Sequence, residues 1–150
     1  MDLQMIRNRM TKILVDMMFV ASIIACIILP FAMPWLLRIT GVSPDLRLFY
    51  TVMMVGAGVC GIYILHQLRG MFKTVIDHNP FVASNVSSLR KCAVASAIIA
   101  LIFGTRLVMW FTFSVAIIVV TFSLLCLLCL TIKDLFKQAV AYKEENDWTV

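Results

Sequence analysis

The chain has 150 residues, of which 62% are hydrophobic and only 14% are charged, against about a quarter charged in an average soluble domain. Uncharged apolar runs of this length indicate membrane spans, so the composition argues against a water-soluble bundle. The net charge of +5 does not indicate direct nucleic-acid binding, because the basic residues flank the apolar runs. We therefore expect an all-α, four-helix transmembrane bundle that forms a single domain over residues 1–150.

The first apolar run follows a basic N-terminal segment and predicts a span over residues 13–31. No cleavable signal peptide is evident, since Pro30 and Pro34 follow the run in place of a small-x-small cleavage site. We expect these prolines to end the helix, because proline removes a backbone donor and clashes with the preceding turn. Asp16 shares a helix face with Lys12, four residues earlier, which predicts an interfacial carboxylate; a functional carboxylate inside the membrane is the alternative.

The second span is predicted over residues 48–68. Small residues recur at a spacing of four within it, a pattern that lets two helix backbones approach closely in lipid. They are Gly56 with Cys60, and Ala57 with Gly61.

The third apolar run, residues 92–104, is too short to cross a membrane alone. It would rise about 20 Å against a hydrocarbon core of about 30 Å. We therefore predict a third span over residues 85–107, with Ser84 or Asn85 as its N-cap. This helix also carries small residues four apart, namely Ser96, Ala100 and Gly104. We expect the second and third helices to pack through these two small-residue faces.

The fourth span is predicted over residues 111–132, which carry no charge. The hairpin before it must be short, and Arg106 is expected to reach the membrane interface; a gating or substrate role for Arg106 is the alternative. After the span, apolar residues fall on one helical face, namely Ile132, Leu135, Phe136, Ala139 and Val140. This pattern predicts a C-terminal amphipathic helix extension that ends in an acidic, extended tail.

The polar segment 69–91 carries four of the thirteen Lys and Arg residues. Because the third helix should begin near residue 85, we expect an interfacial loop over residues 69–83, with Asn79, Pro80 and Phe81 as its turn. Ten of the thirteen basic residues lie in the N-terminal segment, in 69–91 or in the tail, and the positive-inside rule places these parts in the cytoplasm. Aromatic residues then mark the outer interface, namely Trp35, Tyr50 and Trp110.

The sequence lacks the local motifs of common enzymes, such as a phosphate-binding loop, H-E-x-x-H and G-x-S-x-G. Cys126 and Cys129 form a C-x-x-C pattern, but they lie in an apolar run, where cysteine behaves as a small hydrophobe. His66 has no partner ligand at a convincing spacing. We therefore expect no enzymatic activity, no cofactor and no metal.

Several short patterns at their expected places in a four-span chain resemble the bacterial membrane proteins of domain of unknown function 2975. They are Asn79-Pro80-Phe81, the Asn85 and Leu89-Arg90 that follow, and the tail Glu145-Asn146-Asp147-x-Thr149-Val150. The resemblance covers nearly the whole chain. It implies a multi-pass protein of the bacterial plasma membrane and, through gene neighbourhood, a small helix-turn-helix regulator as a cytoplasmic partner.

The leading hypothesis is a membrane regulator or scaffold that docks this partner, with Phe81, Leu89 and Trp148 as apolar anchors. The partner-facing candidates are Asn79, Pro80, Phe81, Arg90, Lys91, Glu145, Asp147 and Trp148.

Two other functions stay open. An immunity or membrane-stress protein would depend on the outer Arg38, Arg47 and Arg106. A small transporter would depend on Asp16 and Arg106, and a pore built from four spans would require a homo-oligomer.

Overall fold

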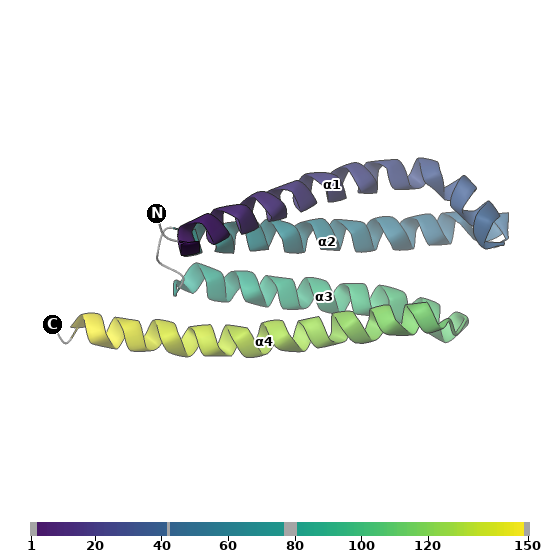
Figure 1. Cartoon of the computed structure of the whole chain (residues 1–150). Helices are drawn as coiled ribbons and strands as arrows, with labels where there is room; N and C mark the ends of the chain where they lie inside the picture. Colours follow the sequence, from purple (N-terminus) through teal and green to yellow (C-terminus); the bar gives the residue numbers. More distant parts are fainter. Residues whose placement is uncertain (1–2, 42, 77–80, 149–150) are drawn as a thin grey trace.

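The computed structural model describes residues 3–41, 43–76 and 81–148, and the side chains of residues 9–41, 43, 45–76 and 81–146. These residues form four α-helices and one short 3-10 helix and contain no strand (Figure 1). The elements are α1 (Leu3–Thr40), η1 (Pro44–Leu46), α2 (Arg47–Ile76), α3 (Ala83–Met109) and α4 (Phe113–Trp148). All four α-helices are long and apolar enough to cross a membrane, so the predicted all-α membrane protein with four spans is confirmed.

The helices pack in chain order, α1 on α2, α2 on α3 and α3 on α4. Neighbouring helices run antiparallel, so both termini lie at the same end of the molecule (Figure 1). α3 is the most buried helix, because α2 and α4 cover two of its sides. Its buried residues are Asn85, Leu89, Cys92, Ala93, Ala95, Ser96, Ile99 and Phe103.

The predicted end of the first helix at its prolines is wrong, since α1 continues through Pro30 and Pro34 to Thr40. Each proline removes only one backbone hydrogen bond, and membrane helices tolerate this loss where neighbouring structure supports them. The helix bends towards α2 beyond these positions (Figure 1). Met33 and Leu37 are buried on this last part of α1, and their packing favours a continued helix.

The predicted loop over residues 69–83 is also wrong, because α2 extends to Ile76 and α3 begins at Ala83. The segment 69–76 contains Met71, Phe72, Val75 and Ile76 and no proline, so the helical pattern of α2 continues through it. The expected N-cap is not used either. Val82 occupies the cap position without a side-chain hydrogen bond.

α4 is one helix of 36 residues, so the predicted continuation of the fourth span is correct, whereas the expected extended tail is wrong. The segment 133–148 contains Lys, Glu, Gln or Ala at half of its positions, and these residues favour helix over extended structure. The hairpin between α3 and α4 is short, as predicted.

The small residues of α2 and α3 do not meet as one interface. An added Cβ at Gly56 would lie 3.7 Å from Ile102 of α3, but one at Gly61 or Gly104 would meet no neighbouring helix within 4 Å. Ala100 lies with Gly104 beside a cavity on the α4 side of α3. The prediction is therefore wrong for Gly61 and Gly104, because the relative rotation of the two helices turns these residues away from their contact.

Ser96 is fully buried on α3 and donates a hydrogen bond to the carbonyl oxygen of Cys92. Ala57 packs at the edge of a core of side chains from α1, α2 and α3. The buried members of this core are Met33, Leu37, Tyr50, Met53, Ile99 and Phe103. Tyr50 is only 9% exposed, so it belongs to the core and not to the predicted lipid-facing aromatic belt.

Candidate functional site at the basic end of the bundle

Ten of the thirteen basic residues gather at the end of the molecule that holds both termini, which we call the basic end. It consists of the start of α1, the end of α2, the start of α3 and the end of α4 (Figure 1). Arg38, Arg47 and Arg106 lie at the opposite, far end. The antiparallel packing thus brings together basic segments that are distant in the sequence.

An ion pair joins α1 to α2 at the basic end. Arg69 donates a hydrogen bond from Nε to Oδ1 of Asp16. Its guanidinium also lies 4.6 Å from the ring centroid of Phe19, which in turn lies 6.1 Å from the ring of His66. The ion-pair partner of Asp16 is therefore Arg69 and not the expected Lys12. A Lys that precedes an Asp by four residues is the weaker order for such a pair on a helix, because it opposes the helix dipole.

A buried polar contact holds the end of α2 against the start of α3. Asn85 is only 2% exposed and donates a hydrogen bond of 2.7 Å from Nδ2 to Oγ1 of Thr74. Thr74 in turn donates to the carbonyl oxygen of Met71 at 2.7 Å. Asn85 therefore acts as a tertiary anchor and not as the predicted helix cap.

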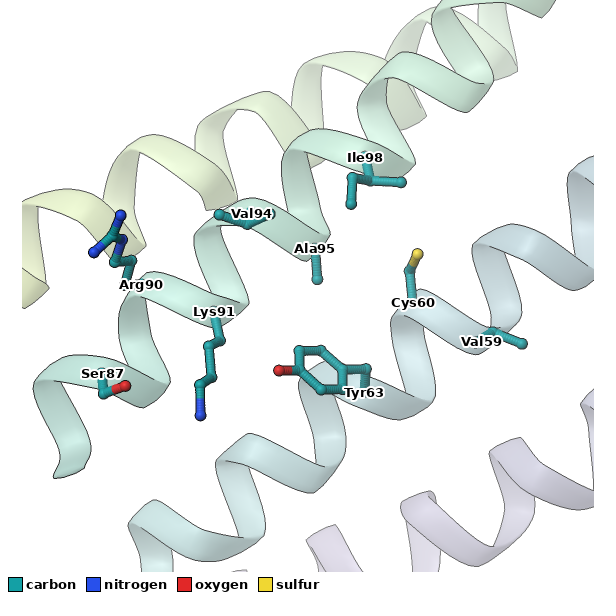
Figure 2. A pocket seen from close by; sticks show the side chains of 9 residues that line it. All are labelled: Val59, Cys60, Tyr63, Ser87, Arg90, Lys91, Val94, Ala95 and Ile98. Atoms are coloured by element: carbon teal, nitrogen blue, oxygen red, sulfur yellow. The ribbon is translucent and has the colours of Figure 1, made fainter.

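A groove between α2 and α3 opens at the basic end and encloses a cavity of about 490 Å³. Figure 2 shows Ser87 and Lys91 reaching from α3 towards the α2 side, and the hydroxyl of Tyr63 pointing towards Lys91. Arg90 leaves α3 on the side away from α2. Further along α3 the groove is apolar, with Val94 and Ile98 on its wall.

Phe81, just before α3, packs on the C-terminal part of α4 beyond the predicted span. The rings of Phe81 and Phe136 have centroids 5.4 Å apart, and Phe81 remains 44% exposed. The predicted turn residues Asn79 and Pro80 lie outside the described residues. The aromatic contact seats the α4 extension against the body of the bundle.

The other partner-facing candidates lie in different environments. Arg90, Lys91 and Glu145 are exposed at the basic end. Leu89 is only 6% exposed, so it packs inside the bundle and does not anchor a partner. Asp147 and Trp148 belong to the last turn of α4, but their side chains lie outside the described part of the structure.

Arg106 lies in the last turn of α3, at the far end of the molecule. Its Nη1 donates a hydrogen bond of 2.8 Å to the carbonyl oxygen of Trp110, and its guanidinium lies 5.3 Å from the ring centroid of Tyr50. A cation in the last turn of a helix also complements the helix dipole. These contacts give Arg106 a structural role at the α3–α4 hairpin.

Sequence reasoning missed Arg69, Thr74 and Phe136 as partners in these contacts. A carboxylate inside an apolar run does signal that a cation should lie nearby. The choice among cations depends on how α1 and α2 are aligned, which no local pattern specifies. Among the described residues, no three His, Cys, Asp or Glu side chains gather closely enough to hold a metal ion.

Comparison with known proteins defines the class of this membrane protein. A family described as protein of unknown function (DUF2975) matches residues 39–150, which include η1, α2, α3 and α4. The chain therefore belongs to this family. The match begins near the end of α1, so it covers less of the chain than the motifs alone indicated. No curated protein and no solved structure matches the chain.

Proposed function

We propose that this protein is a non-enzymatic regulator or scaffold of the bacterial plasma membrane, with both termini in the cytoplasm. Its basic end would dock a small helix-turn-helix transcription regulator. The orientation is supported by the charge distribution, since ten of thirteen basic residues lie at the basic end. Trp35 and Trp110 are 66% and 51% exposed at the far end, where they suit the opposite lipid interface.

The projection of α4 is the observation that carries the docking proposal. Residues 113–132 contain no charge, and about twenty apolar residues suffice to cross a hydrocarbon core of about 30 Å. The remaining segment, 133–148, is still helical and is long enough to project by about 24 Å beyond the span. A helix held outside the membrane presents a surface to soluble proteins.

One face of this projecting segment carries exposed residues at helical spacing, and we call it the tail stripe. Its members are Leu135, Gln138, Tyr142 and Glu145, all of them exposed. Leu135 is 59% exposed and Tyr142, seven residues later, is 72% exposed. Two apolar anchors at this spacing, flanked by polar residues, suit a helix that lies in the groove of a partner. Phe81 supports the stripe through Phe136.

Co-purification tests the proposal. Any small helix-turn-helix regulator that is encoded beside this gene would be co-expressed with the membrane protein and recovered from detergent-solubilised membranes. We expect the Leu135→Glu, Tyr142→Ala double variant to retain at least about tenfold less regulator than the wild type, because loss of two anchors removes most of an interface of this kind. Glu144→Ala, on the other side of the same helix, is the matched control. Equal recovery with the double variant would refute docking at the tail stripe.

The immunity and transport alternatives assign the function to other residues. Protection against a membrane-active peptide would depend on Arg38 and Arg47 at the far end. Transport would depend on Asp16 and Arg106. Cells that express Arg38→Gln, Arg47→Gln or the tail-stripe variant would be compared for survival under peptide stress. Loss of protection with the arginine variants alone would favour an immunity function over docking.

A further inference from the structure

The groove between α2 and α3 is not needed for docking at the tail stripe. Two cavities lie along it, of about 490 Å³ towards the basic end and about 710 Å³ towards the far end. Their lining residues recur every three or four positions, which places them on one face of each helix. On α2 these residues include Tyr63, Val59, Gly56, Val52 and Leu48, and on α3 they include Ser87, Lys91, Val94, Ile98, Leu101 and Thr105. The two cavities are therefore parts of one groove.

The half of the groove towards the basic end is amphipathic. Its mouth holds the ammonium group of Lys91 and the hydroxyl groups of Ser87 and Tyr63 (Figure 2). Its deeper part is lined by aliphatic side chains, with Val94 55% exposed and Ile98 42% exposed. A ligand that fits this half has a polar end and an apolar end.

The mouth of the groove is positively charged, so it favours a ligand whose polar end is anionic. Within the described residues, neither Arg90 nor Lys91 forms an ion pair with a carboxylate. Arg90 also lines this cavity, with its guanidinium directed away from α2, and it adds to the positive potential at the same depth. Basic sites between membrane helices at the cytoplasmic surface favour phosphate headgroups of anionic lipids.

The length of this half of the groove matches the hydrocarbon thickness of one membrane leaflet. Ser87 and Ile98 are eleven positions apart on a continuous helix, a rise of about 16 Å. Half of a hydrocarbon core of about 30 Å is about 15 Å. An acyl chain that begins beside the polar mouth would therefore run along the whole apolar wall.

We propose that this half of the groove binds an anionic phospholipid, with its phosphate at Lys91, Ser87 and Tyr63 and one acyl chain along Val94 and Ile98. A helix from a second copy of the chain suits the groove less well, because it would have to bring a carboxylate to Lys91. Asp16 is the only acidic residue in the four predicted spans, and it already pairs with Arg69.

The test measures bound lipid directly. Full-length protein in detergent is titrated with phosphatidylglycerol or with phosphatidylcholine of the same acyl chains, and retained lipid is counted by native mass spectrometry. We expect preferential retention of phosphatidylglycerol and about tenfold weaker binding in the Arg90→Gln, Lys91→Gln variant. Lys137→Gln removes a charge from the same end of the molecule, outside the groove, and is expected to bind like the wild type.

A second variant tests the acyl-chain path without a change of charge. Val94→Trp fills the apolar wall from an exposed position, so it does not disturb the core. It is expected to weaken phosphatidylglycerol binding, whereas free glycerol phosphate, which has no acyl chain, should not compete with the lipid. Three results would each overturn the proposal: unchanged binding in Val94→Trp, equal retention of both lipids, or a lipid-free dimer whose interface is the groove.

Discussion

The guanidinium of Arg69 on α2 donates a hydrogen bond to the carboxylate of Asp16 on α1 and also lies over the ring of Phe19. The two charged side chains are 39% and 35% exposed, so lipid headgroups and water still reach them. The pair joins residues 53 positions apart in the sequence. The ion pair can therefore form only if α1 and α2 are aligned as they are in this structure.

Asp16→Ala is expected to lower the unfolding free energy by about 1 kcal/mol, because the pair is partly exposed and its attraction is partly screened. Thermal unfolding in detergent measures the effect. The charge-swapped variant Asp16→Arg, Arg69→Asp serves as the control and should recover part of the lost stability. If Asp16→Ala unfolds at the wild-type temperature, the ion pair contributes nothing to the α1–α2 contact.

Asn85→Ala is expected to cost about 2 kcal/mol, since it leaves Thr74 without its partner and opens a space in a buried contact. Thr74→Val removes the other side of the same hydrogen bond. Because both variants break one interaction, the double variant should be less destabilised than the sum of the two single variants. Strict additivity in chemical unfolding experiments would contradict a direct interaction between these side chains.

Gly58 and Gly61 form a matched pair on α2. An added Cβ at Gly58 would lie 3.1 Å from Sγ of Cys26 on α1, whereas one at Gly61 would meet nothing within 4 Å outside its own helix. Both Ala variants gain helix propensity, but only Gly58→Ala crowds a side chain of the neighbouring helix. We expect Gly61→Ala to be at least as stable as the wild type and Gly58→Ala to be about 1 kcal/mol less stable than Gly61→Ala.

Cysteine removal provides the control for this comparison. Cys26→Ala leaves room for the new methyl group and should restore stability in the Gly58→Ala background. The stabilities are compared by thermal unfolding in the same detergent. A Gly58→Ala variant that matches Gly61→Ala would show that α1 and α2 do not approach as closely at this position.

The proposed orientation predicts which engineered thiols react from outside the cell. Ser43 lies at the far end between α1 and α2, and Glu144 lies on the α4 extension; both are exposed. An impermeant maleimide should label Ser43→Cys in intact cells and Glu144→Cys only after the cells are permeabilised. The wild-type chain measures the background from its five native cysteines. The reverse labelling pattern would invert the orientation and leave the antiparallel fold intact.

The sequence by itself determined the class of the protein and the number of its helices. Long uncharged runs predict membrane helices because lipid offers no hydrogen bonds to the backbone, and this constraint acts locally. For the same reason the short third run predicted that its helix must extend towards residue 85. Local rules failed at the helix ends, where α1 continues through two prolines and α2 continues to Ile76.

The tertiary structure alone decided which residues meet. Asp16 could have paired with Lys12 on its own helix, but the alignment of α1 with α2 brings Arg69 to it. Asn85 looked like a helix cap, but it lies opposite Thr74 and is buried there. Gly61 and Gly104 had the spacing of a packing motif, yet the rotation of their helices leaves both without a close neighbour from another helix. Helix periodicity places residues on a face, and only the packing of the four helices decides what each face contacts.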